Sequence, residues 1–157
     1  MNKFIKKPYL WFNMKKILLI SFTALFFSCG SPTKVFENTH FENIYKAQNS
    51  GKSVSGYEVL NSNEEYLSFI EKMKLDQVED VHLFEPDFEN NSVIAVYMGQ
   101  KSSGGYEVEV ENLYWVDSVL HVKTKKINPK KGEMSTMALT SPYCLTIIPK
   151  VKTIVLE

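Results

Sequence analysis

The chain has 157 residues, 44% of them hydrophobic, with 18 basic side chains, 18 acidic side chains and two cysteines. This length allows one ordinary domain with a single core. Five lysines and no acidic residue precede Cys29, which leaves 13 lysines against 18 acidic residues, a net charge of about −5 that argues against nucleic acid as a partner.

The N-terminal segment has the pattern of a secretory signal. Met14 and two lysines come first, a largely apolar run covers residues 17–27, and the small residue Ser28 precedes Cys29. The run is shorter than the roughly 20 residues that a helix needs to cross a bilayer. We therefore predict a signal peptide over residues 1–28, with Met14 as an alternative start.

Cys29, directly after the apolar core, resembles the cysteine of a bacterial lipobox, whose thiol is acylated and becomes the mature N-terminus. Phe27 is bulky for that motif, whereas Ser28 agrees with it, and an ordinary signal peptide with a chance cysteine is the alternative. A lipid on Cys29 would attach the chain to a membrane, since each buried methylene contributes about 0.8 kcal/mol. The predicted location is the cell envelope, on the periplasmic face of an outer membrane, because residues 30–33 carry no acidic export signal.

The chain after Cys29 divides into a tether and a domain. Residues 29–52 are rich in Ser, Asn, Thr and Lys, and we predict a lipid-bearing tether there. A single domain is expected over residues 53–157. Its first strand is predicted at Ser53–Leu60, where Tyr57 and Val59 share one side.

A helix follows this strand. Ser62 and Glu65 have the spacing of a capping box, and apolar residues recur after them at helical intervals. This pattern predicts a helix over residues 63–74.

The rest of the domain favours strands. Residues 92–98 form an apolar run that is typical of a buried strand, and Gly105–Trp115 alternates apolar residues with glutamates, which indicates one buried and one wet face. Val119–Lys126 is expected to pair back as a hairpin, and two more strands are predicted at 143–148 and 151–156. Six strands and one helix predict an α+β domain, a strand-dominated antiparallel sheet or sandwich with the helix packed on it.

The sequence contains no strong catalytic motif. Its three histidines lie far apart at His40, His82 and His121. Cys144 and a histidine could form a nucleophile pair, but an apolar strand favours a buried structural thiol. With Cys29 lipidated, Cys144 would also have no disulfide partner.

An acidic stretch offers oxygen and nitrogen ligands for a metal at short spacing: His82, Glu85, Asp87 and Glu89. The set matches neither an EF-hand nor a zinc site, and a solvated loop is the simpler interpretation. We therefore predict no enzyme activity, no metal and no small-molecule substrate.

The stretch Lys101–Tyr106 carries two adjacent glycines before the alternating strand. Glycines permit positive φ and a close backbone approach, so the stretch is either a turn or bulge that aims Tyr106 into the core or an exposed loop that docks on a partner. The residues alone favour the structural role.

The region Phe88–Lys150 resembles the C-terminal domain of the PrcB family of protease-complex subunits. That family has an apolar strand, a Gly-x-Lys-x-Ser-Gly-Gly-Tyr loop, a hairpin, a proline-containing arm and a Thr-x-Pro-Tyr segment. The corresponding residues here are Gly99, Lys101, Ser103, Gly104, Gly105, Tyr106, Pro129, Thr140, Pro142 and Tyr143.

The resemblance implies a non-enzymatic, lipid-anchored envelope protein, an accessory or assembly subunit that binds a secreted or surface protease and needs no cofactor. The partner-binding residues that it implies are Lys101, Ser102, Ser103, Gly104, Gly105, Tyr106, Thr140, Pro142 and Tyr143. With a regular hairpin, these two segments would lie at one end of the sheet. The alternative is a protease inhibitor that presents a Gly-rich loop in the manner of chagasin, although the other loop motifs of that family are missing from this sequence.

Overall fold

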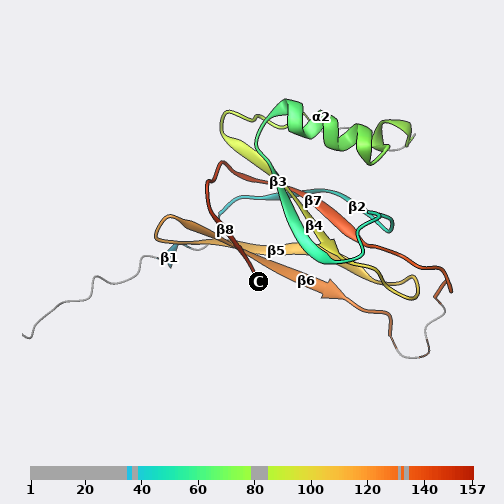
Figure 1. Ribbon diagram of the computed structural model, residues 1–157. Coiled ribbons are helices and arrows are strands. Elements are labelled where there is room, and N and C mark those ends of the chain that lie inside the picture. Colours follow the sequence, from blue (N-terminus) through green and yellow to red (C-terminus); the bar gives the residue numbers. More distant parts are fainter. Residues whose placement is uncertain (1–34, 37–38, 79–84, 131, 133–134) are drawn as a thin grey trace, which may run out of the picture. The chain divides into compact units, whose positions relative to one another are not determined.

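The computed structural model describes residues 35–36, 39–78, 85–130, 132 and 135–157, all within one compact unit, Thr33–Glu157 (Figure 1). The predicted signal peptide and Cys29 lie outside the described residues. The elements are β1 (Val35–Phe36), β2 (Glu42–Ala47), β3 (Ser55–Leu60), α2 (Asn63–Lys72), the 3-10 helix η2 (Leu75–Gln77), β4 (Asn91–Met98), β5 (Glu107–Val116), β6 (Val119–Ile127), β7 (Tyr143–Pro149) and β8 (Ile154–Leu156).

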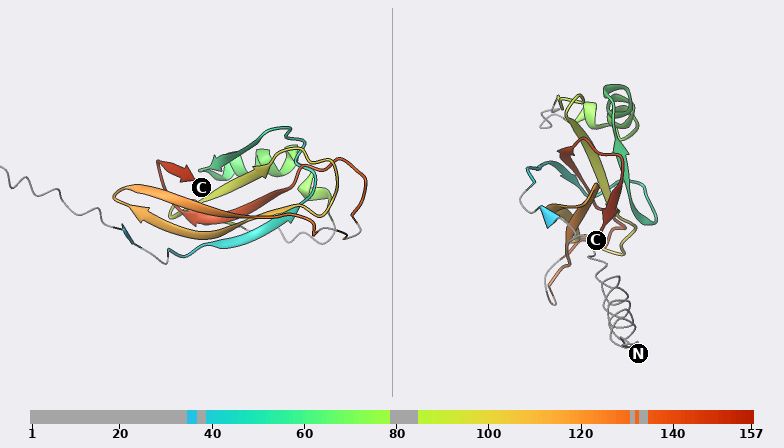
Figure 2. Two further views of the ribbon diagram at one scale, coloured as in Figure 1. Left: turned by 90° about the horizontal axis from the view of Figure 1, so that it is seen from below. Right: turned by 90° about the vertical axis from the view of Figure 1, so that its left-hand side faces the viewer.

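The strands form two four-stranded sheets. Sheet A has the order β1-β5-β6-β8, and sheet B has the order β2-β7-β4-β3. All neighbours are antiparallel except β6 and β8, which are parallel. The sheets stack face to face and α2 covers the outer face of sheet B (Figures 1 and 2). The predicted fold class, a strand-dominated α+β sandwich with one helix packed on it, is confirmed.

Two apolar cores lie on the two faces of sheet B. The core between the sheets consists of Ile94, Val96, Met98, Val108, Val110, Leu113, Leu120, Val122, Cys144 and Ile148. The core beneath the helix consists of Leu60, Tyr66, Phe69, Ile70, Leu75, Val93, Ala95, Tyr97, Tyr143 and Leu145. The central strands β4 and β7 contribute alternate residues to each core. This explains why residues 92–98 are apolar throughout, since a strand that is covered on both faces has no wet side.

Helix α2 begins where the capping pattern predicts. The Ser62 Oγ accepts a hydrogen bond from the Glu65 N–H at 3.2 Å, and the Glu65 carboxylate accepts one from the Asn61 N–H at 2.7 Å. The helix ends at Lys72, two residues before the predicted end, and Lys74 then adopts the left-handed conformation at φ 54°. Among the described residues, no helix is long and apolar enough to span a bilayer.

The β5–β6 hairpin is confirmed, with its turn at Asp117, which has φ 54°. The predicted alternation holds through Val108 and Val110, which are 1% and 2% exposed. The register then shifts between Val110 and Asn112, so that Leu113 becomes the next fully buried residue. The extra residue of this bulge reverses the inside-outside phase of the strand.

Strands β1 and β2 are absent from the sequence prediction, which places a tether over residues 29–52. Strand β2 is an edge strand that pairs with β7, and its register shifts between Asn43 and Tyr45. This irregularity breaks the period-2 pattern by which a strand is recognised. A second difference is β8, which begins at Ile154 instead of residue 151.

Side chains of β2 connect sheet B to strand β5 of sheet A. The Asn43 amide donates to the Val110 C=O at 3.0 Å and accepts from the Val110 N–H at 3.3 Å. The Lys46 ammonium bonds to the Glu109 carboxylate, which lowers the pKa of that carboxyl. Edge strands have unpaired backbone groups, and these side-chain contacts close that side of the sandwich.

Candidate functional site

The two predicted partner-binding segments meet at one end of the sandwich. The Lys101 N–H donates to the Thr140 C=O at 2.7 Å, and the Thr140 N–H donates back to the Lys101 C=O at 3.0 Å. The Thr140 hydroxyl also donates to the Ser103 C=O at 2.7 Å. The Lys101–Tyr106 loop and the segment before β7 therefore form one hydrogen-bonded unit. A regular β5–β6 hairpin was expected to bring both segments to the same end of the sheet.

Both adjacent glycines of the loop face the arm that precedes Thr140. The Gly104 N–H donates to the Thr136 C=O at 2.9 Å, and a Cβ on Gly104 would lie 2.5 Å from the Thr136 Oγ1. Gly105 has φ +83°, and a Cβ there would lie 3.0 Å from Pro129. The glycines thus allow the loop to pack closely on its own arm, which is a structural role.

The two tyrosines of the predicted site differ in their surroundings. Tyr143 is 2% exposed and belongs to the core beneath the helix, with its ring centroid 5.9 Å from that of Tyr45. Tyr106 is half-buried against the core between the sheets, and its C=O accepts from the Gln48 amide at 3.0 Å. The Lys101 ammonium lies 5.6 Å from the centroid of the Tyr106 ring.

Burial separates the nine predicted site residues into two groups. Ser102 and Gly105 are exposed, and Lys101, Ser103 and Tyr106 are half-buried, so these five reach the surface. The buried members are Gly104, Thr140, Pro142 and Tyr143. A partner can touch only the first group directly, and the second group holds the first in place.

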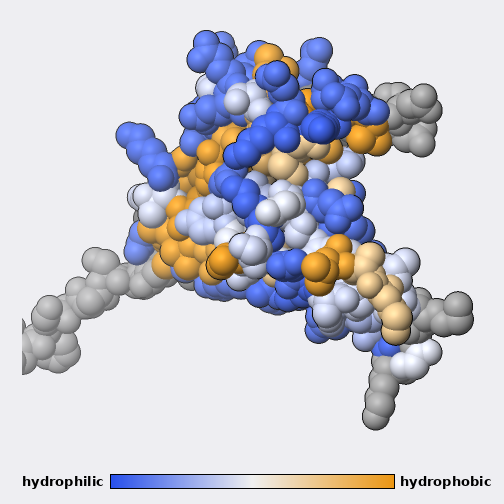
Figure 3. Space-filling view, turned by 45° about the vertical axis from the view of Figure 1, so that its right-hand side comes forward, coloured by the Kyte–Doolittle hydropathy of each residue, from blue (hydrophilic) through white to orange (hydrophobic). Residues whose placement is uncertain are grey.

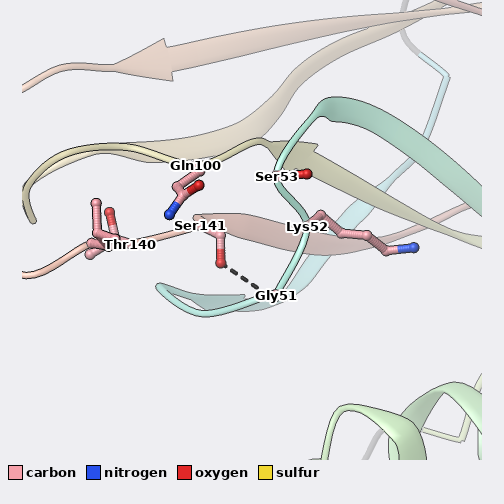
Figure 4. A pocket seen from close by; sticks show the side chains of 7 residues that line it. Gly51, Lys52, Ser53, Gln100, Thr140 and Ser141 are labelled. Atoms are coloured by element: carbon pink, nitrogen blue, oxygen red, sulfur yellow. Dashed lines mark hydrogen bonds between the residues drawn. The ribbon is translucent and has the colours of Figure 1, made fainter.

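The loop between β2 and β3 joins the same end and is absent from the sequence-based site. The Ser50 N–H donates to the Ser141 C=O at 2.9 Å, and the Gly51 N–H donates to the Ser141 Oγ at 3.0 Å. The Gln100 N–H donates to the Ser53 C=O at 3.1 Å. A cavity of about 140 Å³ lies among these segments (Figure 4), lined by Gly51, Lys52, Ser53, Gln100, Leu139, Thr140 and Ser141.

Three large apolar side chains of these segments are exposed. Val54 is 75% exposed, Leu139 is 67% exposed and Met137 is fully exposed at 101%. We call residues 49–54, 99–106 and 135–142 together the loop end. Figure 3 turns this end of the unit forward and shows separate hydrophobic areas among hydrophilic atoms. The exposed apolar side chains are thus spread over the loop end and form no single large patch there.

Residues 92–149 match the family described as PrcB C-terminal. This stretch of the chain is similar to a PrcB C-terminal domain. The predicted resemblance is thereby confirmed for the region from β4 to β7, and no curated protein and no solved structure matches the chain.

The matched residues provide most of the loop end, including the Lys101–Tyr106 loop and residues 135–142. The loop at 49–54 and helix α2 lie before the matched residues. The cavity is therefore lined from both sides of that boundary, by Gln100 and Leu139 within the segment and by Gly51 before it. The part of the site that sequence reasoning missed is the part without a recognisable motif.

Cys144 does not have the surroundings of a nucleophile. Its side chain is 0% exposed between the sheets, and burial raises the pKa of its thiol to about 11. His121 lies on the outer face of β6, where its ring stacks on Tyr114 and its Nδ1 is 2.8 Å from a Glu157 oxygen. Cys144 belongs to sheet B and faces the core between the sheets, whereas His121 lies on the outer face of sheet A. The two residues form no catalytic pair, because a reactive thiolate needs access and a lowered pKa.

The acidic stretch before β4 is explained in part by a turn. The Asp87 carboxylate accepts hydrogen bonds from the Asn90 amide at 2.8 Å and the Glu89 N–H at 3.0 Å, which lower the pKa of Asp87. His82 lies outside the described residues. Within the described ranges, no group of three or more His, Cys, Asp or Glu residues is arranged to hold a metal ion.

Proposed function

We propose that the protein is a non-enzymatic accessory subunit of a protease complex, anchored in the cell envelope by a lipid on Cys29, and that it binds the protease through the loop end. The match of residues 92–149 to the PrcB C-terminal family carries this proposal, because that family is one of protease-complex subunits. The match supports a role as a subunit of a complex. That the partner is a protease at the cell envelope is part of our proposal.

The construction of the loop end supports binding to a protein. Its backbone is held by bonds between segments that are distant in sequence, such as Lys101 with Thr140 and Ser50 with Ser141. A surface that is already ordered loses little conformational freedom on association, so more of the contact energy remains as affinity. The exposed side chains of Met137 and Leu139 can then serve as apolar anchors at the centre of an interface.

The glycine loop favours a subunit over an inhibitor. An inhibitor of the chagasin kind would present its Gly-rich loop to the active-site cleft of a protease. Here Gly104 and Gly105 face Thr136 and Pro129 of the chain's own arm. A loop whose glycines are used internally is less free to enter a cleft than one that projects.

Co-purification from detergent-solubilised envelope tests the proposal, with the tagged full chain as bait and cleavage of labelled casein as the readout. We expect proteolytic activity to co-purify with the wild-type chain and to be lost with Met137→Asp and Leu139→Asp. Leu67→Asp is the matched control, because Leu67 is an exposed leucine (53%) on α2, away from the loop end. Equal recovery with Leu139→Asp and Leu67→Asp, or no protease with the wild-type chain, would contradict the proposal.

The lipid anchor has its own test. Cells that express the full chain are fed an alkyne-labelled palmitate, and Cys29→Ser is compared with Cys144→Ser. The proposal expects label on the wild-type chain and on Cys144→Ser but not on Cys29→Ser, and recovery of the labelled chain in the outer membrane. Label that persists on Cys29→Ser would refute an anchor at this residue.

A further inference from the structure

The loop end differs in charge from the chain as a whole. Its three segments contain the two lysines Lys52 and Lys101 and no acidic residue, whereas the chain after Cys29 has an excess of about five acidic residues. Local positive potential on an acidic protein attracts acidic segments and repels basic ones. The charge of this surface therefore selects among partner segments.

The two lysines have different local partners. The Lys52 ammonium pairs with the Glu58 carboxylate, so its charge is already compensated. The Lys101 ammonium lies over the Tyr106 ring, and within the described residues no carboxylate forms an ion pair with it. An aromatic face holds a cation in place without neutralising it. Lys101 is thus a positioned and uncompensated positive charge, and its backbone is paired with Thr140, which lines the cavity.

The cavity at the loop end has the size and lining for one side chain of a peptide. Its volume of about 140 Å³ is smaller than the roughly 300 Å³ at which small-molecule pockets begin. Figure 4 shows the Gln100 amide near Thr140 and Ser141, with the Lys52 side chain turned away from them. A side-chain amide both donates and accepts hydrogen bonds, as the backbone of an extended peptide also does.

We propose that the loop end binds an extended acidic segment of its protein partner, with an acidic side chain at Lys101 and an apolar side chain seated against Leu139. This inference rests on the proposed function, because it names the chemistry of the segment that the same surface takes. The apolar contact contributes affinity, and the charge contributes orientation and selectivity.

An anionic membrane surface is the other partner that a positive, apolar end could meet. Clusters of about 4–8 Lys or Arg are typical of segments that bind anionic lipids. The loop end has only Lys52 and Lys101, and Lys52 is paired with Glu58. The uncompensated charge of Lys101 is therefore too small for a lipid surface and suffices for one carboxylate.

The test measures fluorescence anisotropy of labelled peptides with the full chain solubilised in detergent. One peptide has a leucine flanked by aspartates and glutamates, a second has the same leucine flanked by lysines, and a third replaces the leucine of the acidic peptide with serine. Phosphatidylglycerol vesicles compete in a separate arm. The variants are Lys101→Glu and Leu139→Asp, with Lys152→Glu and Leu67→Asp as matched controls, since Lys152 is exposed between β7 and β8 at the opposite end of β7.

We expect the acidic peptide with leucine to bind best, and Lys101→Glu to weaken it about tenfold because an attractive charge becomes repulsive. Leu139→Asp should weaken it similarly, while both control variants stay within about twofold. Equal binding of the acidic and basic peptides would overturn the inference, as would equal effects of Lys101→Glu and Lys152→Glu. Vesicle binding that depends on Lys101 without binding of the acidic peptide would overturn it in favour of a membrane.

The experiments distinguish an error in the acidic-segment inference from an error in the proposed function. If protease activity co-purifies and is lost with Leu139→Asp but not with Lys101→Glu, the proposed function stands and the acidic segment is wrong. If the acidic peptide binds as expected but no protease co-purifies, the chemistry of the surface stands and the partner is another protein.

Discussion

The centre of sheet B and the loop end are parts of one domain that are stabilised in different ways. In the centre, β4 and β7 place apolar side chains into cores on both faces, and Ile94, Val93 and Cys144 are 0% exposed. At the loop end, hydrogen bonds and close glycine contacts hold the backbone, and Met137 and Leu139 remain exposed. Residues of the centre are thus determined by packing, whereas the exposed residues of the loop end are free to be selected for contact with a partner.

The largest loss of stability is expected for a substitution in the centre of sheet B. Ile94→Ala should destabilise the domain by about 2–5 kcal/mol, because it removes buried methyl groups and leaves a cavity between the sheets. Urea unfolding followed by circular dichroism measures the change. The control Leu67→Ala, at a 53% exposed leucine, should change the free energy of unfolding by no more than about 0.5 kcal/mol. Similar costs for the two variants would show that the centre is not closely packed.

Substitution of the loop glycines should cause the next largest loss of stability, and the loss should differ between Gly104 and Gly105. Gly105→Ala is expected to cost about 1–3 kcal/mol, since it forces a side chain into φ +83° against Pro129. Gly104→Ala should cost less, because the Thr136 hydroxyl that it meets belongs to an exposed side chain that can rotate. Thermal unfolding of the two variants gives the order, and a larger cost at Gly104 would contradict it.

Removal of the Asn43 side chain, which connects the two sheets, should lower the stability by a smaller amount. Asn43→Ala removes two hydrogen bonds to the Val110 backbone and one from the Thr146 hydroxyl, which is buried. We expect a loss of about 1–2 kcal/mol, because a buried hydroxyl and a backbone group would lose their partners. Asn43→Asp keeps the acceptor and should retain part of the stability. Hydrogen exchange at Val110 that is unchanged in Asn43→Ala would contradict the role of this amide.

The smallest change in stability is expected for substitutions of the exposed residues of the loop end. Leu139→Asp and Met137→Asp should change the free energy of unfolding by less than about 0.5 kcal/mol, since these side chains are 67% and 101% exposed. The same thermal unfolding assay measures the change. A cost comparable with that of Gly105→Ala would show that these side chains support the fold, and their exposure would then say nothing about a partner.

Local patterns predicted the elements that obey them. The apolar run of β4 and the alternation of β5 identify buried strands, and the Ser62–Glu65 pair identifies the start of α2. Strand β2 was not predicted, because its bulge at Asn43 and Tyr45 and its polar edge position remove the alternation of apolar and polar residues. The fold class was predictable from most of its strands even though two of them were missed.

The site was predictable only where a motif marks it. The resemblance connects the Lys101–Tyr106 loop with Thr140, and the structure brings them into contact. The loop at 49–54 reaches the same place through hydrogen bonds from Ser50 and Gly51 to Ser141, about 90 residues away, and no local pattern signals such a contact. Burial of Pro142 and Tyr143 likewise follows from tertiary packing, which the sequence does not display.

The order of strands in sheet B has a consequence for the time at which the protein folds. Strand β2 has β7 as its strand neighbour, and β4 has β7 on one side, yet β7 is made about 100 residues after β2. A chain is synthesised from its N-terminus, so β2 and one edge of β4 wait unpaired until Pro149 has left the ribosome. Sheets whose pairings join distant parts of the chain form slowly, because a long loop must close before any contact compensates for it. Sheet B is therefore completed only after β7 has been made, and the apolar stretch at 92–98 needs protection from aggregation until then.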